Sequence, residues 1–285
     1  MNRDLIQFKQ QRELGEIISV SFKFLRENYK TYFRLLVKVA GPAFLLLIAA
    51  LSYYSYTTLG DPLNTEEFLS GGFLISFGIL ALTLLLYFSV VYATVFNLIK
   101  SYIENEGEIK DPEVAAWAKD DLAKMFGLNI ISWIFIFAGM MLFLIPGIYV
   151  SVPLSIAMAA LVFKNQSISE SIAEGFKLVK DNWWMSFLTL VFIWIIIYVI
   201  SLIFQLPLII YTFVKAFTSV SEGSAADMSE MFDWVYILFS IISSLVQYIF
   251  YSIIPIGIAF LYFHLNEKKN FTGTYERIDK LGNNS

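Results

Sequence analysis

Charged residues in this sequence gather in short clusters, and the segments between the clusters are apolar over the length that a lipid bilayer demands. Only 15% of the 285 residues are charged and 58% are hydrophobic, with a mean hydropathy of +0.66, whereas soluble domains carry about 25% charged residues. A helix needs about 20 apolar residues to cross roughly 30 Å of hydrocarbon. The charge-free segments are residues 39–56, 69–99, 126–163, 183–214 and 234–265. We therefore predict an all-α polytopic membrane protein with a single membrane domain over residues 1–285.

The third segment, residues 126–163, is long enough to cross the membrane twice. It contains Leu-Ile-Pro-Gly-Ile-Tyr, in which Pro146 cannot donate a backbone hydrogen bond and Gly147 can adopt a positive φ. We expect a tight turn there, and therefore a helical hairpin. The second arm, residues 148–163, is short and contains Pro153, so a re-entrant segment is the alternative to a second crossing.

The basic residues favour six crossings with both termini in the cytoplasm. In that topology every Lys and Arg except Lys215 lies on one side of the membrane, and basic residues are enriched on the cytoplasmic side. If the arm at 148–163 did not cross, the basic residues of 164–182 and of the C-terminal tail would move outside. The predicted spans are residues 36–56, 70–97, 126–145, 148–163, 184–206 and 234–263, before a cytoplasmic tail at 266–285.

Two prolines mark the last two spans. Pro207 predicts a kink or an early end of the fifth span, because proline removes a helical hydrogen bond. The last charge-free segment is too long for a straight crossing, so we expect it to tilt or to break at Pro255. The first thirty residues contain charges and offer no apolar segment of the kind that a signal peptide needs.

Three segments on the predicted cytoplasmic side have the periodicity of interfacial amphipathic helices: residues 5–34, 113–125 and 167–182. In the first and third, apolar residues recur every three or four positions and charged residues fill the other face. Ser167 and Ser169 are candidate caps for the third. We expect these helices to lie in the membrane interface, where amphipathic helices are stable.

The first and third amphipathic segments also resemble each other, which suggests an internal repeat. The repeated unit would be an interfacial helix followed by a membrane hairpin, used three times if the weaker middle segment is counted. The aligned identities are Glu16 with Glu170, Phe22 with Phe176, Lys23 with Lys177, Asn28 with Asn182 and Phe33 with Phe187.

Four pieces of the sequence together resemble a known membrane domain: Leu14 to Ile17, the turn at 144–149, the run from Ser169 to Trp184, and the ending at 261–266. They resemble the membrane domain attached to some bacterial glycerophosphodiester phosphodiesterases and related six-helix bacterial membrane proteins. The resemblance covers nearly the whole chain and implies a protein of the bacterial cytoplasmic (inner) membrane. The catalytic (β/α)₈ barrel of those enzymes, about 250 residues long, has no counterpart here, so the resemblance implies no activity.

A stripe of basic residues on the amphipathic helices is a candidate site for anionic lipid headgroups, since each basic residue near the surface adds roughly 1 kcal/mol. The alternative is that these charges only set the topology. The stripe consists of Lys23, Arg26, Lys30 and Arg34. The corresponding basic residues of the segment at 167–182 are Lys177 and Lys180.

Small and polar residues within the spans predict close helix packing. Ser, Gly and Ala let helix backbones approach, and polar side chains hydrogen-bond between helices. We assign the packing and hairpin positions to Pro146, Gly147, Ser151, Ser155 and Ala159. The polar residues expected to bond between helices include Asn129, Ser201, Gln205 and Gln247.

No combination of residues predicts catalysis, a metal site or a cofactor. The sequence has no cysteine and one histidine, His264, which we expect to be solvated at the cytoplasmic interface. An acidic segment from Glu104 to Asp121 lacks the pattern of an EF-hand, so we expect a solvated loop.

We therefore expect a non-enzymatic membrane protein that acts as a scaffold or regulatory subunit for other membrane proteins and contacts anionic lipid. A transporter or lipid-moving protein for an uncharged or amphipathic substrate is the alternative, although the predicted spans hold no acidic or basic residue at membrane depth. An intramembrane enzyme would need a nucleophile or metal that these residues do not supply. The net charge of −4 and the striped basic residues give no support to a nucleic-acid partner.

Overall fold

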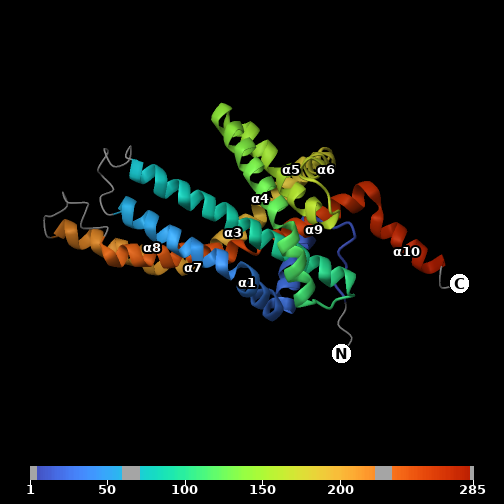
Figure 1. Cartoon of the computed structure of the whole chain (residues 1–285), viewed down its shortest axis with the longest axis horizontal. Coiled ribbons are helices and arrows are strands. Elements are labelled where there is room, and N and C mark those ends of the chain that lie inside the picture. The colour runs from blue at the N-terminus through green and yellow to red at the C-terminus, as the bar shows by residue number, and fades with distance from the viewer. Residues whose placement is uncertain (1–4, 60–70, 222–232, 283–285) are drawn as a thin grey trace. The chain divides into compact units, whose positions relative to one another are not determined.

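The computed structural model describes residues 5–59, 71–221 and 233–282, and nearly all of them are α-helical (Figure 1). Six helical segments of this described part are long and apolar enough to cross a membrane, with α8 and α9 together forming the last. This confirms the predicted all-α fold and the polytopic membrane class. Residue 70 of the predicted second span and residues 283–285 of the predicted tail lie outside the described residues. The helices are α1 (Leu14–Leu59), α3 (Gly71–Glu104), α4 (Asp111–Leu142), α5 (Leu144–Phe163), α6 (Ile168–Val179), α7 (Trp183–Ser221), α8 (Trp234–Tyr251), α9 (Ile254–Asn270) and α10 (Thr272–Gly282).

Two of the three predicted interfacial helices are not separate elements. The segment predicted at 5–34 begins its helix only at Leu14, and α1 then continues into the first span without a break. The segment at 113–125 is likewise the beginning of α4. α4 runs through Gly127 at this junction, and α1 runs through Gly41 and Pro42 early in the first span. An established helix gains one hydrogen bond for each residue added. Continuation is therefore favoured over a new start.

The third predicted interfacial helix is separate, and its beginning supports the internal repeat. Ser167 caps α6 by accepting from the Glu170 backbone N–H, while the Glu170 carboxylate accepts from the Ser167 N–H at 2.9 Å, which completes a capping box. At the start of α1 the Glu16 carboxylate accepts from the Glu13 N–H at 3.1 Å. The alignment that pairs Glu16 with Glu170 also pairs Glu13 with Ser167, so both copies begin with the same carboxylate contact.

The hairpin of α4 and α5 turns at Phe143, not at the predicted Pro-Gly pair. Phe143 is extended (φ −160°, ψ 147°), and its N–H reaches Gly139 O at 3.1 Å. Pro146 lies in the first turn of α5, where a missing N–H removes no helical hydrogen bond. Gly147 is helical and serves close packing, because a Cβ on it would lie 2.8 Å from the Met140 backbone nitrogen.

The last span breaks, as Pro255 predicts. α8 ends at Tyr251, and Pro255 occupies the first turn of α9. The Ile256 N–H donates to Ile253 O at 3.1 Å, and the Tyr32 hydroxyl donates to Ser252 O at 2.5 Å. By contrast, α7 continues through Pro207 to Ser221, so the predicted early end does not occur.

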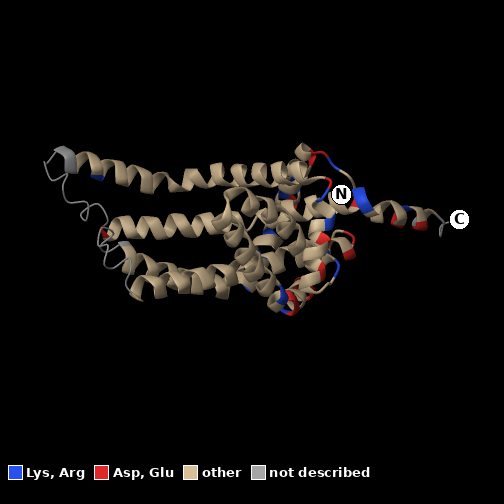
Figure 2. Cartoon of the chain, turned by 90° about the horizontal axis from the view of Figure 1, so that it is seen from above, with Lys and Arg blue, Asp and Glu red and all other residues tan. Residues whose placement is uncertain are grey.

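The chain divides into two compact units. Unit 1 comprises residues 1–40, 88–194 and 252–285, and unit 2 comprises 41–87 and 195–251. Most described acidic and basic residues belong to unit 1 (Figure 2). In the described part of unit 2 they are Lys215 and Asp233, which form an ion pair at 2.8 Å. Unit 2 therefore has the composition of a membrane-embedded helix bundle.

Helix packing inside unit 1 is tight around α9, whose residues from Pro255 to Glu267 are buried on all sides. Gly175 of α6 is a packing residue that sequence reasoning missed, since a Cβ there would lie 3.0 Å from the Ala157 backbone nitrogen of α5. Of the predicted small residues, Ala159 is fully buried. Ser151 and Ser155 are half-buried, and each donates to a carbonyl of its own helix at 2.8 Å.

Three of the polar side chains predicted to bond between helices do so, namely Asn129, Gln205 and Gln247. In unit 1, Asn129 of α4 donates to the Ser89 hydroxyl of α3 at 2.9 Å. In unit 2, Gln205 of α7 donates to Gln247 of α8 at 3.5 Å. Ser201 instead donates to carbonyls of its own helix. These contacts give the bundle its register without requiring a bound ligand.

Candidate functional site

Residues 5–13 form an extended N-terminal strap across unit 1. Its anchor is Phe8, which is 3% exposed and stacks on Phe260 of α9 with ring centroids 4.3 Å apart. The backbone N–H of Ile6 donates to the Tyr102 hydroxyl at 3.1 Å. The Phe8 ring also meets three further rings edge-on, those of Phe24, Tyr102 and Phe263. The strap is therefore part of the aromatic core of unit 1.

Arg12 ends the strap and is itself buried. Its guanidinium donates to the backbone carbonyls of Gln7 and Phe8, which folds the strap back on itself. Burial lowers the pKa of Arg12 to about 10, partly offset by the charge of Glu16. The group stays positively charged at neutral pH and is satisfied by carbonyl oxygens.

His264 does not lie free in solvent, so that prediction was wrong. It is 6% exposed, and its Nδ1 accepts the backbone N–H of Arg12 at 2.9 Å. The acceptor nitrogen carries no proton in this arrangement, and the proton is assigned to Nε2 from the hydrogen bond. The sequence could not show this, because the strap that covers His264 is more than 250 positions away along the chain.

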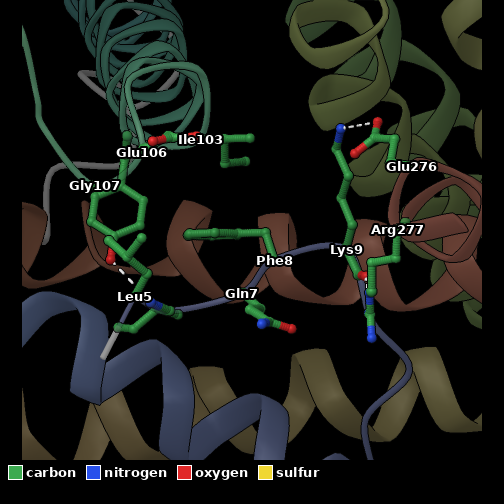
Figure 3. A pocket seen from close by; sticks show the side chains of 12 residues that line it. Leu5, Gln7, Phe8, Lys9, Ile103, Glu106, Gly107, Glu276 and Arg277 are labelled. Carbon is green, nitrogen blue, oxygen red and sulfur yellow. Dashed lines mark hydrogen bonds and ion pairs between the residues drawn. The ribbon is translucent and has the colours of Figure 1, made fainter. Parts of the chain in front are cut away.

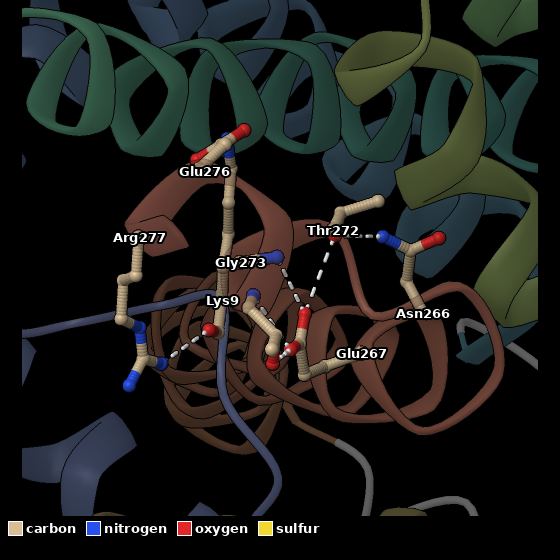
Figure 4. Close-up of polar contacts among 8 residues, drawn as sticks. Lys9, Asn266, Glu267, Thr272, Gly273, Glu276 and Arg277 are labelled. Carbon is tan, nitrogen blue, oxygen red and sulfur yellow. Dashed lines mark hydrogen bonds and ion pairs between the residues drawn. The ribbon is translucent and has the colours of Figure 1, made fainter. Parts of the chain in front are cut away.

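The strap is also tied to α10. Lys9 Nζ lies 2.5 Å from the Glu276 carboxylate, and the Arg277 guanidinium donates to Lys9 O at 3.2 Å (Figure 4). Gly273 permits this approach, since a Cβ there would lie 2.7 Å from Lys9 Cβ. The N-terminal and C-terminal segments therefore hold each other in place.

α10 begins on a buried carboxylate. Glu267 is 3% exposed and accepts from the backbone N–H groups of Gly273 at 2.7 Å and Thr274 at 3.0 Å, and from the Thr274 hydroxyl at 2.6 Å (Figure 4). These are the N–H groups that a helix start leaves without partners. Part of the predicted tail is thus an ordered helix that the sequence reading missed. The threonines after Phe271 were the available signal.

Two cavities flank the strap inside unit 1. The larger, about 360 Å³, has apolar walls that include Leu5, Phe8 and Ile103; in Figure 3, Glu106 lies at one end and Arg277 at the other. The smaller, about 230 Å³, is lined by Lys100, Lys164 and Asn266 among others. Both are bordered by Lys9 and Glu276. The larger cavity has the size of a small-ligand site, with mixed charges around an apolar interior.

The predicted basic stripe is exposed along α1, but one of its four residues is held in an ion pair with another helix. Lys23, Arg26 and Lys30 are exposed, and Lys23 lies 3.9 Å from Glu27 in a weak surface pair. Arg34 instead bonds Asp111 at the start of α4, with a nitrogen-oxygen distance of 2.9 Å. The stripe available to a headgroup therefore narrows to three residues on α1.

The basic residues of α6 divide in the same way. Lys180 is exposed at the end of the helix. Lys177 lies 3.6 Å from Glu174, whose other oxygen is 2.6 Å from Lys164. Burial opposes ionisation of Glu174, but the two lysines outweigh it and lower the pKa of this carboxyl. The cluster fixes α6 against the end of α5.

Two carboxylates of the acidic segment, residues 104–121, accept hydrogen bonds from asparagine side chains of α3 and of the turn that follows it. Asp121 accepts from Asn97 at 2.9 Å, and Glu113 accepts from Asn105 at 3.0 Å. Within the described residues no group of three His, Cys, Asp or Glu side chains is arranged to hold a metal ion.

Taken with its spans, the chain is a polytopic α-helical membrane protein with a charged assembly of helix ends and terminal segments. No family model, curated protein or solved structure matches it.

Proposed function

We propose that this protein is a non-enzymatic scaffold or regulatory subunit for other membrane proteins, which contacts anionic lipid at the face where its termini lie. The observation that carries the proposal is the construction of unit 1. Its strap, α6 and α10 bind one another through ion pairs such as Lys9–Glu276 and Lys164–Glu174, while Arg26 and Lys30 remain exposed. A surface whose elements are held together by ion pairs and whose other cations are exposed is better suited to binding partners and lipid than to catalysis.

The topology and location belong to the same proposal. The basic residues support six crossings with both termini in the cytoplasm, and the resemblance to phosphodiesterase-associated membrane domains supports the bacterial inner membrane. Partners would meet the end of the helices where most described charged residues lie, which the proposed topology assigns to the cytoplasm.

A transporter or lipid-moving protein is the second candidate, favoured by one observation. The last span is interrupted between Tyr251 and Ile254, and interrupted helices are common at the substrate sites of transporters. In this protein the Ser252 carbonyl at the break accepts a hydrogen bond from the Tyr32 hydroxyl. This contact favours a structural role for the break over a role in binding substrate.

The experiment is extraction of tagged protein in native membrane patches, followed by mass spectrometry of proteins and lipids. The scaffold proposal expects a stoichiometric partner and enrichment of anionic lipid. A triple variant Lys23→Gln, Arg26→Gln, Lys30→Gln should lose most of that enrichment, whereas Lys23→Arg, Arg26→Lys, Lys30→Arg should keep it. A protein that returns alone with one enriched solute or neutral lipid would favour transport.

A further inference from the structure

α10 carries an apolar stripe that no other part of the described chain covers. The stripe consists of Tyr275, Ile278 and Leu281 at helical spacing, which are 63%, 57% and 74% exposed, and of Phe271 just before the helix, which is 47% exposed. Single exposed apolar residues are common on protein surfaces. Three on one face of a three-turn helix, with Phe271 directly before it, form an apolar stripe, and exposed apolar patches often mark interaction sites.

The opposite face of α10 holds the helix in place. Gly273, Glu276 and Arg277 face the strap through the contacts with Lys9. At 3.6 residues per turn these positions lie across the helix from Tyr275 and the rest of the stripe. The stripe is therefore presented outward on a helix that is fixed from behind.

The chain turns sharply before α10. Phe271 adopts the left-handed conformation (φ 50°, ψ 30°), and Figure 1 shows α10 leaving in a different direction from α9. Because α9 is the end of the last span, this turn takes α10 out of the line of the spanning helix. An amphipathic helix that lies along a membrane surface needs such a turn.

We propose that α10 is an interfacial helix whose apolar stripe enters the bilayer leaflet on the side of the termini. The proposal deepens the proposed function by assigning it a second lipid contact besides the stripe on α1. Exposed basic residues accompany α10, namely Lys268 and Lys269 at its base and Arg277 within it. Lys268 also donates to the Asn182 side chain at 2.6 Å, and Lys269 lies 3.5 Å from Asp181. Of the two acidic residues of α10, Glu276 is neutralised by Lys9. Such a composition suits anionic headgroups beside inserted apolar groups.

A second copy of the chain fits the stripe less well. A stable protein interface buries about 800 Å² on each partner and uses roughly 20–30 residues a side. Four side chains over three turns supply a small part of that. A bilayer imposes no such minimum, because the surrounding headgroups and acyl chains adapt to the helix.

The test uses the absence of cysteine from the sequence. Ile278→Cys is labelled with an environment-sensitive fluorophore and reconstituted in nanodiscs of phosphatidylcholine with phosphatidylglycerol. We expect emission shifted to the blue, strong quenching by nitroxide lipids labelled near the headgroup, and several-fold weaker quenching by aqueous iodide than for Asp279→Cys, the matched control on the polar side.

Two outcomes would overturn the proposal. If iodide quenches both positions equally, the stripe is in water. If Ile278→Cys is shielded from iodide but not quenched by nitroxide lipid, a protein covers it. Repeating the measurement in the Lys23, Arg26 and Lys30 triple glutamine variant separates the two proposals, because α10 should still insert when the α1 stripe no longer retains anionic lipid.

Discussion

The hydroxyl of Tyr32 donates to the backbone carbonyl of Ser252 at 2.5 Å, and both groups are buried. Tyr32 belongs to α1 and Ser252 lies at the break between α8 and α9. A break in a spanning helix leaves carbonyls without their helical partners, which is costly away from water. Tyr32 satisfies one of them from the first helix of the chain.

Tyr32→Phe should therefore destabilise the protein, by about 1 to 2 kcal/mol, because the substitution leaves a buried carbonyl without this donor. Thermal unfolding in detergent would measure the change as a lower Tm. Tyr29→Phe is the matched control, since Tyr29 is 51% exposed on the same helix. Equal Tm values for the two variants would contradict the role given to Tyr32.

Gly147→Ala should loosen the α4–α5 hairpin. A Cβ at this position would lie 2.8 Å from the Met140 backbone nitrogen, so the helices must separate, and overpacking of this kind costs about 1 to 3 kcal/mol. Gly78→Ala is the control, because a Cβ there meets nothing within 4 Å, and alanine is the better helix former. The prediction fails if both variants unfold at the temperature of the unmodified protein.

Phe8→Ala should detach the strap. Truncation of a buried phenylalanine costs about 3 to 5 kcal/mol, and the ring contact with Phe260 would be lost. Limited proteolysis should then cleave the N-terminal segment at protease concentrations that leave the unmodified protein intact. The neighbouring Gln7→Ala changes an exposed side chain and should retain protection. Protection of both variants would show that the strap does not depend on its aromatic anchor.

The Glu174 cluster predicts a pH dependence of stability. The pKa of Glu174 is lowered in the folded protein from its ordinary value of 4.5, so the unfolded state binds the proton more readily. The contribution to stability is fully present above pH 4.5 and is lost as the pH falls below that value, through the folded pKa.

The measurement is the difference in Tm between the unmodified protein and Glu174→Gln, taken from about pH 7 down to about pH 3. We expect a difference at neutral pH that narrows on acidification. Glu108→Gln, at an exposed position, controls for the general effect of removing a carboxylate. A difference that stays constant with pH would mean that Glu174 acts through packing alone.

The sequence itself determined the membrane class, the six spans that the described residues show and the break near Pro255, because these depend on local quantities. Apolar length decides whether a segment can cross a bilayer, and the missing N–H of proline acts where it stands. The capping box at Ser167 and Glu170 is equally local, since its two groups are three residues apart.

Only the tertiary structure decided how the ends of the chain are used. The strap over His264, the ion pair of Lys9 with Glu276, and the start of α10 on Glu267 are contacts that local periodicity does not report. The same holds for Gly147, where the sequence suggested a turn and the structure shows a close approach of two helices. Periodicity shows which face of a helix is apolar, but the residue that meets that face depends on how distant segments pack in three dimensions.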